Sequence, residues 1–146
     1  MYDVITIGSS VVDIYVMSSQ FRLRKTDAGL QLCEQYGTKI DVDSFKIRSG
    51  GGGSNTAVGF ARLGFSVGIV SETGKDAFSQ VILEDLHEAR VSINLIAQEK
   101  KEETGGSIVL VGKDGGRTIL VHRGASTMLD PEDLPVGHIQ RARWIH

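Results

Sequence analysis

Residues Ser49–Phe65, SGGGGSNTAVGFARLGF, join four consecutive glycines to a segment that predicts a helix. Glycine is a poor helix former, and it loses more conformational freedom on folding than any other residue. The glycines therefore form a tight strand-to-helix turn, or they let a polar ligand approach the backbone amides at the start of the helix. The glycines alone favour neither interpretation. We expect the helix itself over Thr56–Leu63, capped by Ser54 or Asn55 and stopped by Gly64.

Two familiar phosphate-binding motifs do not fit this stretch. A Walker-type loop requires a lysine after its last glycine, and no lysine lies between Arg48 and Lys75. A dinucleotide fingerprint requires G-x-G-x-x-G directly after the first strand, and Thr56 occupies the position of the third glycine. The ligand at this turn, if there is one, need not be an anion, because the Asn55 amide offers donors and an acceptor that suit hydroxyl groups.

The rest of the chain alternates strands and helices. Short β-branched runs predict strands, and the spacing of Phe78, Val81, Ile82, Leu86 and Ala89 predicts a helix from Asp76 or Ala77 to about Arg90. The order strand, helix, strand, helix, strand indicates a parallel sheet with crossover helices. The predicted strands are Tyr2–Gly8, Val11–Val16, Val67–Ser71 and Val91–Ala97, and the final RARWIH resembles the start of another.

Other segments favour antiparallel pairing. Apolar and polar residues alternate over residues 39–50, and two β-branched runs flank Lys113–Gly116, whose Asp-Gly pair is a strong hairpin signal. The charged run Gln98–Thr104 predicts a solvated loop, and Asp130–Pro135 predicts a capped short helix.

Composition limits the class of protein. The chain has 146 residues, 40% hydrophobic and 23% charged, with a net charge of −2 and no basic block, which argues against a nucleic-acid partner. No run is long enough to cross a membrane, and the first residues lack the pattern of a signal peptide. The single cysteine, Cys33, favours a cytoplasmic protein, and the four scattered histidines predict no metal site.

Asp13 interrupts an apolar run, VVDIYV, just after the first predicted strand. Ligands of open α/β sheets gather at the carboxyl ends of strands, and a carboxylate flanked by Val12 and Ile14 must be paired or hold a polar group. The alternative is that Asp13 caps a turn or faces solvent from an edge strand, which is commoner for a single aspartate.

At this point the chain resembles a known family. Residues Gly50–Ala57, followed by six residues to Gly64 and nine more to Gly74, are similar to the first signature of the ribokinase/PfkB-type carbohydrate kinases. VITIGSSVVDIYV resembles the opening strand and sugar-contacting aspartate of that family. ETGGSIVLVGKDGGRTILVHRGAS resembles its Thr-Gly-led lid hairpin, with Ser126 in place of the usual asparagine.

The resemblance implies an enzyme that transfers the γ-phosphate of ATP to a hydroxyl of a sugar or nucleoside. It implies a doubly wound, ribokinase-like parallel α/β sheet with a small antiparallel β-sheet lid, made of strands inserted at about 14–49 and 105–123. By the same resemblance, Asp13, Gly51, Gly52 and Asn55 bind the substrate and Gly50 and Gly53 shape the loop. The residues expected to close the lid are Thr104, Gly105, Ser107 and Ile119.

The second signature of the family, which carries the catalytic base, does not occur in this sequence. We therefore expect residues 1–146 to be the N-terminal, sugar-binding part of a truncated kinase domain, without a catalytic residue. ATP and Mg²⁺ would be bound mainly by a C-terminal half that is absent here, so this part alone should be inactive. A homodimer through the lid is a further expectation. The alternative is a non-catalytic sugar-binding or interaction module of this length only, and the residues do not name the sugar.

Overall fold

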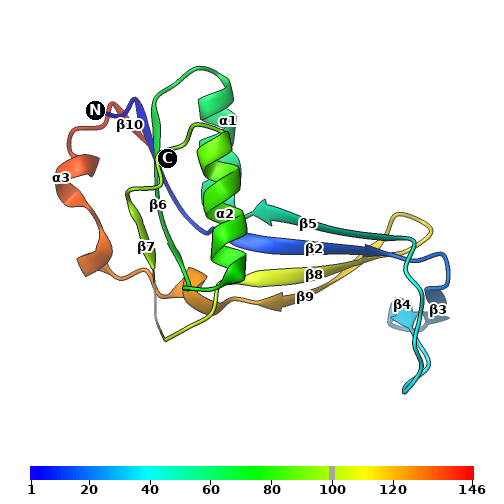
Figure 1. Cartoon of the computed structure of the whole chain (residues 1–146). Helices are drawn as coiled ribbons and strands as arrows, with labels where there is room; N and C mark the ends of the chain where they lie inside the picture. The colour runs from blue at the N-terminus through cyan, green and yellow to red at the C-terminus, as the bar shows by residue number, and fades with distance from the viewer. Residues whose placement is uncertain (99–100) are drawn as a thin grey trace.

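The computed structural model describes residues 1–98 and 101–146, and it shows an α/β body from which a second sheet extends to one side (Figure 1). Two residues of the predicted loop Gln98–Thr104, Glu99 and Lys100, lie outside the described residues. The chain leaves the body after its first strand, builds two of the four strands of the second sheet, and returns at the glycine run. The glycines therefore lie at the junction of the two parts.

The body contains a four-stranded parallel sheet in the order β10-β1-β6-β7. Helices α1 (Gly52–Arg62) and α2 (Ala77–Glu88) cover one face, and α3 (Val136–Ile139) lies on the other (Figure 1). Within residues 1–98 and 101–146, no helix has the length and apolar content needed to cross a bilayer. The predicted parallel sheet with crossover helices is confirmed. Its strands are β1 (Val4–Ile7), β6 (Val67–Thr73), β7 (Ile96–Gln98) and β10 (Trp144–Ile145).

Aliphatic side chains pack on both faces of this sheet. Ile69 packs with Ile82 and Leu86 of α2 on one face, and all three are fully buried. On the other face, buried Ile5 and Val70 pack against Leu134 and Ile139 of the segment around α3. Burial of each such side chain stabilises the fold by about 1.5–3 kcal/mol. The two-sided core is the doubly wound arrangement that the resemblance implies.

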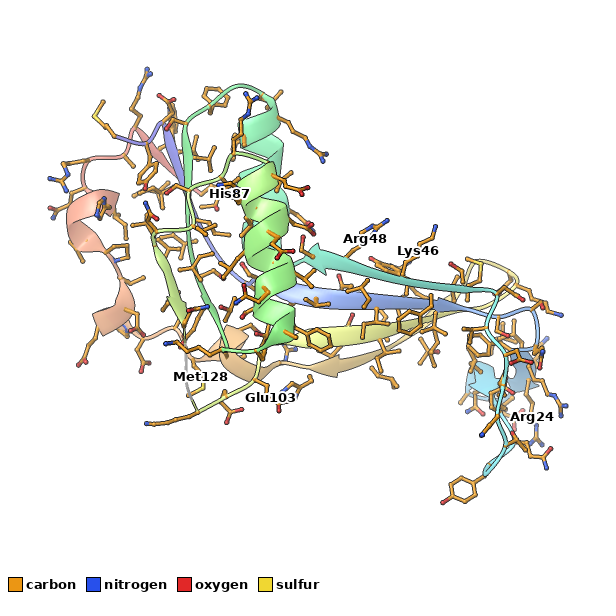
Figure 2. All side chains as sticks on the ribbon, viewed as in Figure 1. Arg24, Lys46, Arg48, His87, Glu103 and Met128 are labelled. Atoms are coloured by element: carbon orange, nitrogen blue, oxygen red, sulfur yellow. The ribbon has the colours of Figure 1, made fainter. Side chains whose placement is uncertain are left out.

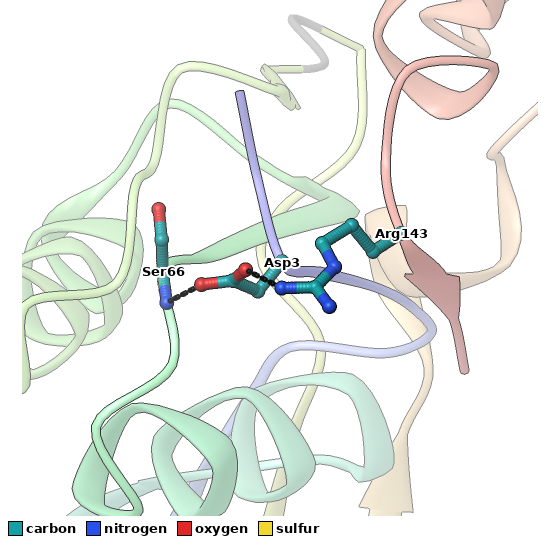
Figure 3. Close-up of polar contacts among 3 residues, drawn as sticks. All are labelled: Asp3, Ser66 and Arg143. Carbon is teal, nitrogen blue, oxygen red and sulfur yellow. Dashed lines mark hydrogen bonds and ion pairs between the residues drawn. The ribbon is translucent and has the colours of Figure 1, made fainter.

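Asp3 joins the beginnings of three adjacent strands (Figure 3). Its Oδ2 accepts a hydrogen bond from the Ser66 amide at 3.0 Å, just before β6, and its Oδ1 lies 3.3 Å from Nη1 of Arg143, just before β10. The bond from Ser66 is the main cause that lowers the pKa of Asp3, and Arg143 lowers it further against the opposing effect of desolvation.

The second sheet has the order β5-β2-β8-β9. Strands β2 and β8 run parallel, whereas β5 and β9 are antiparallel to their neighbours. The predicted hairpin around Lys113–Gly116 is confirmed as the β8–β9 connection. A separate hairpin of β3 (Arg22–Thr26) and β4 (Gly29–Cys33) lies at the far end (Figure 1). The strands of the second sheet are β2 (Val11–Met17), β5 (Ser44–Gly50), β8 (Gly106–Val111) and β9 (Arg117–His122).

Charged side chains line the outer edge of the second sheet at β5. Figure 2 shows Lys46 and Arg48 projecting outward from this edge strand. Charges on an edge strand oppose pairing with another chain, so this edge is protected against edge-to-edge association.

Three local predictions need correction or refinement. Helix α1 begins at Gly52 rather than Thr56, and its N-cap is Gly51, which provides no side-chain cap; neither Ser54 nor Asn55 caps it. The helix starts earlier because Ser9 binds its first amides, as described below. The expected strand Val91–Ala97 is wrong over most of its length, because only Ile96–Gln98 forms a strand and Ser92 makes a single bridge to Gly68.

Two predicted helix starts are confirmed. Asp76 caps α2, with its side chain accepting from the Ser79 amide at 2.9 Å. Asp130 precedes the 3₁₀ turn η2 (Pro131–Asp133), whose first residue is a proline as the sequence predicts. A second 3₁₀ turn, η1 (Gly124–Thr127), follows β9.

Candidate functional site

The first turn of α1 is held against the loop that follows β1. The backbone oxygen of Ser9 accepts hydrogen bonds from the amides of Gly53, at 3.1 Å, and Ser54, at 3.4 Å. The Ser9 hydroxyl accepts from the Gly52 amide at 3.2 Å. These are the first three amides of the helix, which one of the two interpretations of the glycine run offered to a ligand. In the structure they already donate hydrogen bonds within the chain.

Close approach to the loop after β1 explains two of the four glycines. Gly51 has a φ of 97°, in the left-handed region, and a Cβ on it would collide with the backbone oxygen of Ser9. A Cβ on Gly53 would lie 2.7 Å from the backbone oxygen of Gly8. Both glycines therefore allow the helix start to pack on the loop after β1, which is the turn interpretation.

Gly52 differs from its neighbours. A Cβ at this position would meet nothing within 4 Å, and the residue is exposed. Packing within the chain gives no reason for a glycine here. The second interpretation, in which a ligand approaches the backbone, therefore stays a prediction at Gly52.

Asp13 lies on β2 beside the glycine run. Its Oδ1 accepts a hydrogen bond from the Ser107 hydroxyl at 2.5 Å, and a Cβ on Gly50 would collide with its Oδ2. Gly50 therefore makes room for this carboxylate. Among the described residues nothing donates a hydrogen bond to Oδ2 and no cation pairs with Asp13. A half-buried carboxylate with one oxygen left open is suited to accept hydrogen bonds from a ligand.

The Asp13 carboxylate faces a cavity of about 520 Å³ on one face of the second sheet. The cross-strand register explains the grouping, because Asp13 pairs with Ser107 and Ser107 with Val121. Ile119 lies one pair further along the same face. Three of the predicted site residues, Asp13, Ser107 and Ile119, thus line one cavity, whose size is in the usual range for small-molecule sites.

The cavity also contains residues that the sequence did not single out. Ser9 lies two residues after the end of β1, and this place at the carboxyl end of a parallel strand is the signal that could have found it. Tyr15 and Arg117 come from the same sheet face, and the register that places them there depends on pairing β2 with β8, which sequence periodicity does not reveal. Ser126, noted as a departure from the family pattern, lines this cavity too.

Three other predicted residues lie elsewhere. Asn55 is exposed on α1 and lines a groove between α1 and α2, together with Arg48 and Asp85. Thr104 is buried, with 2% of its surface exposed, and its hydroxyl is bound to Asp76 and Gly74. Gly105 has no room for a side chain because a Cβ would collide with the backbone oxygen of Arg123. The structure does not bring these residues to the cavity that Asp13 faces.

The comparison with family models matches residues 1–144 to the pfkB family carbohydrate kinases, and the chain belongs to this family. The resemblance stated from the glycine signature and Asp13 is confirmed. The fold class is confirmed with it, because the structure of ribokinase from Giardia lamblia matches 99% of this chain with a TM-score of 0.81 at 24% identity.

Named relatives cover most of this chain but less than half of their own length. Ribokinase from Mus musculus is 32% identical over 131 residues, which are 90% of this chain and 37% of that protein. A deoxyribokinase from Salmonella typhi is 26% identical, over 90% of this chain and 39% of that protein. The structure of Arabidopsis thaliana ribokinase complexed with ribose and ATP matches 85% of this chain and 36% of its own, at 25% identity and a TM-score of 0.72. These shares fit an N-terminal half of the family's kinase domain.

Proposed function

We propose that this chain is the sugar-binding part of an ATP-dependent carbohydrate kinase that phosphorylates a hydroxyl of a sugar or nucleoside. The observation that carries the proposal is the Asp13 carboxylate, half-buried at a cavity of about 520 Å³ with its Oδ2 free of hydrogen bonds from the described residues. Hydrogen bonds from hydroxyl groups to a charged acceptor contribute about 1.5–3 kcal/mol each.

The walls of the cavity suit a sugar. The C–H face of a sugar ring can pack against the apolar side chains of Val109, Ile119 and Val121. Its hydroxyls can form hydrogen bonds with the polar groups of Asp13 and Ser9. The Gly52 backbone is exposed, and its amide donates a hydrogen bond to the hydroxyl of Ser9, which lines this cavity. In this proposal the second sheet acts as the lid, with strands within about 14–49 and 105–123, and Ser107 holds Asp13 in place.

ATP and Mg²⁺ belong to the proposal as partners bound mainly outside this chain. No group of three or more histidine, cysteine, aspartate or glutamate side chains in residues 1–98 and 101–146 is arranged to hold a metal ion. Phosphoryl transfer needs a base for the attacking hydroxyl and groups that neutralise the phosphates. We assign neither role to a residue of this chain, so residues 1–146 alone should transfer no phosphate.

An ATP-consumption assay with a panel of sugars and nucleosides tests the proposed function. The protein encoded by the complete reading frame should consume ATP in the presence of one acceptor, and purified residues 1–146 should not. Comparable turnover by residues 1–146 would contradict the placement of the catalytic groups. If the reading frame ends at His146 and the chain binds a sugar without consuming ATP, the alternative of a non-catalytic sugar-binding module is correct.

We also propose a homodimer through the second sheet, on the face opposite the Asp13 cavity. The register aligns Ile47, Ile14, Ile108 and Leu120 in one cross-strand row, in which Ile47, Ile108 and Leu120 are 37%, 39% and 54% exposed. An apolar sheet face of this kind suits a second copy of the same chain, since a two-fold interface uses the same surface twice.

Sedimentation velocity tests the dimer. Leu120→Asp should convert a dimer into monomers, whereas Leu63→Asp, at an exposed position at the end of α1, should not. A wild-type monomer at micromolar concentration, or a dimer that survives Leu120→Asp, would contradict the proposal. We also propose that the protein is cytoplasmic, because Cys33 is the only cysteine in these 146 residues and the cytoplasm keeps thiols reduced. Imaging of a fluorescent fusion tests this proposal.

A further inference from the structure

The Thr104 hydroxyl is fully used inside the chain. It donates to Oδ1 of Asp76 at 2.8 Å and accepts from the amide of Gly74 at 3.0 Å. The Thr104 amide donates to Oδ2 of Asp76 at 2.7 Å. A buried threonine with its donor and acceptor both engaged is an anchor between segments, and it has no hydroxyl to offer to a substrate.

Asp76 divides its carboxylate between two tasks. Oδ1 accepts the Ser79 amide and so caps α2, while both oxygens bind Thr104. Desolvation raises the pKa of Asp76, but the hydrogen bonds from Thr104 and Ser79 outweigh it, and the net effect is a lowered pKa. The carboxylate is therefore stabilised in its charged form at the point where the body meets the second sheet.

The chain runs from this anchor directly to the Asp13 cavity. Figure 1 shows the N-terminal end of α2 beside the start of β8, and Figure 2 shows Glu103 beneath it. The backbone oxygen of Gly105 accepts from the Val12 amide at 3.0 Å, one residue before Asp13. Ser107, three residues after Thr104, donates its hydroxyl to Asp13. The Gly105 oxygen and the Ser107 hydroxyl therefore set the position of the Asp13 carboxylate. We expect a shift of Thr104 to move both groups.

We propose that Asp76 is a positioning residue for the acceptor site: through Thr104 it fixes the start of β8, and with it Ser107 and Asp13. The inference rests on the proposed function for its effect on substrate binding. Asp76 touches neither the cavity of Asp13 nor Asp13 itself, so it acts only through the anchor. Supporting residues of this kind hold a binding group within the narrow range of useful positions.

Asp76→Asn separates the two tasks of this carboxylate. Asparagine caps helices about as well as aspartate, so one amide oxygen still serves the Ser79 amide. The new NH₂ group cannot accept a hydrogen bond from the Thr104 amide, and two donors then face each other. Thr104→Val removes the hydroxyl and leaves the buried Gly74 amide without its acceptor, whereas Thr104→Ser keeps the hydroxyl. Asp130→Asn makes the same chemical change at an exposed aspartate next to η2 and serves as the control.

The variants are compared in the protein encoded by the complete reading frame. Two readouts are used: steady-state kinetics with the acceptor from the sugar panel, and hydrogen–deuterium exchange of the segment 105–111. Asp76→Asn and Thr104→Val should each raise the KM for the acceptor about tenfold and speed exchange in β8, with the KM for ATP unchanged. Thr104→Ser and Asp130→Asn should resemble the wild type in both readouts.

Two results would overturn the proposal. The first is an unchanged acceptor KM and unchanged exchange in β8 for both Asp76→Asn and Thr104→Val. The second is a Thr104→Ser variant as impaired as Thr104→Val, because the hydroxyl would then not be the acting group. If the wild-type protein phosphorylates no acceptor, the proposed function is wrong, but this result does not test the role of Asp76. Hydrogen–deuterium exchange of β8 in the variants then decides whether Asp76 fixes this strand.

Discussion

Gly52→Ala separates the two uses of glycine at the start of α1. Gly52 is the first residue of the helix, it has no positive φ, and a Cβ would meet nothing within 4 Å. Alanine should therefore fit without strain, and its better helix propensity should stabilise the fold. The gain in a helix interior is about 0.8–1 kcal/mol, and at the first position we expect about 0.5 kcal/mol. The melting temperature should rise by about 1–2 °C.

Acceptor binding should change in the opposite direction. If the acceptor lies against the exposed backbone of Gly52, the added methyl group occupies its space. A loss of about 1.4 kcal/mol corresponds to a tenfold weaker affinity, and we expect at least this change in the KM for the acceptor. A stability gain combined with an affinity loss cannot come from damage to the fold.

Gly59→Ala is the matched control, because Gly59 also lies within α1, is exposed, and leaves open space for a Cβ. Neither glycine lines the Asp13 cavity, but Gly52 contacts Ser9 of that cavity and Gly59 lies further along the helix. Gly59→Ala should raise the melting temperature and leave the acceptor KM unchanged. Calorimetric melts and steady-state kinetics on the complete protein give both values. An unchanged acceptor KM in Gly52→Ala, with the expected rise in melting temperature, would refute the placement of the acceptor at this backbone.

The remaining predictions concern stability. Gly51→Val should lower the free energy of unfolding by about 3 kcal/mol or more, because a β-branched residue at a φ of 97° would also collide with Ser9; an unchanged urea midpoint would contradict this. Asp76 and Asp3 have lowered pKa values in the folded chain, so their contributions are present above the ordinary aspartate pKa and are lost as the pH falls through the lowered values. Asp76→Asn should therefore flatten the acid limb of the unfolding free energy against pH, and an equally steep limb in this variant would disprove the contribution of Asp76.

Local sequence patterns predicted the elements whose signals are local. The Asp-Gly turn predicted the β8–β9 hairpin, and Asp76 was correctly expected near the start of α2. The start of α1 was predicted four residues too late, because its capping oxygen comes from Ser9, far from Gly52 in the sequence. A helix end satisfied by a distant loop leaves no local signature.

The candidate site was predicted only in part, because local signals mark some of its residues whereas contacts between distant segments bring them together. Asp13 stood out as an acid within an apolar run, and Ser107 and Ile119 followed from the family resemblance. Their common cavity depends on the parallel pairing of β2 with β8, which joins segments about ninety residues apart. Thr104 was expected at the lid, but its burial against Asp76 depends on a contact between the residue that caps α2 and the segment before β8, which no single segment encodes.

Calorimetric titration of the acceptor into wild-type protein and into Asp13→Ala and Asp13→Asn tests the central claim most directly. The wild type should bind the acceptor in the absence of ATP. Both variants should lose that binding while they keep the melting transition, because Asp13 makes no ion pair and one side-chain hydrogen bond among the described residues. Unchanged affinity of Asp13→Asn and Asp13→Ala for the acceptor would contradict the assignment of Asp13 as the group that holds its hydroxyls.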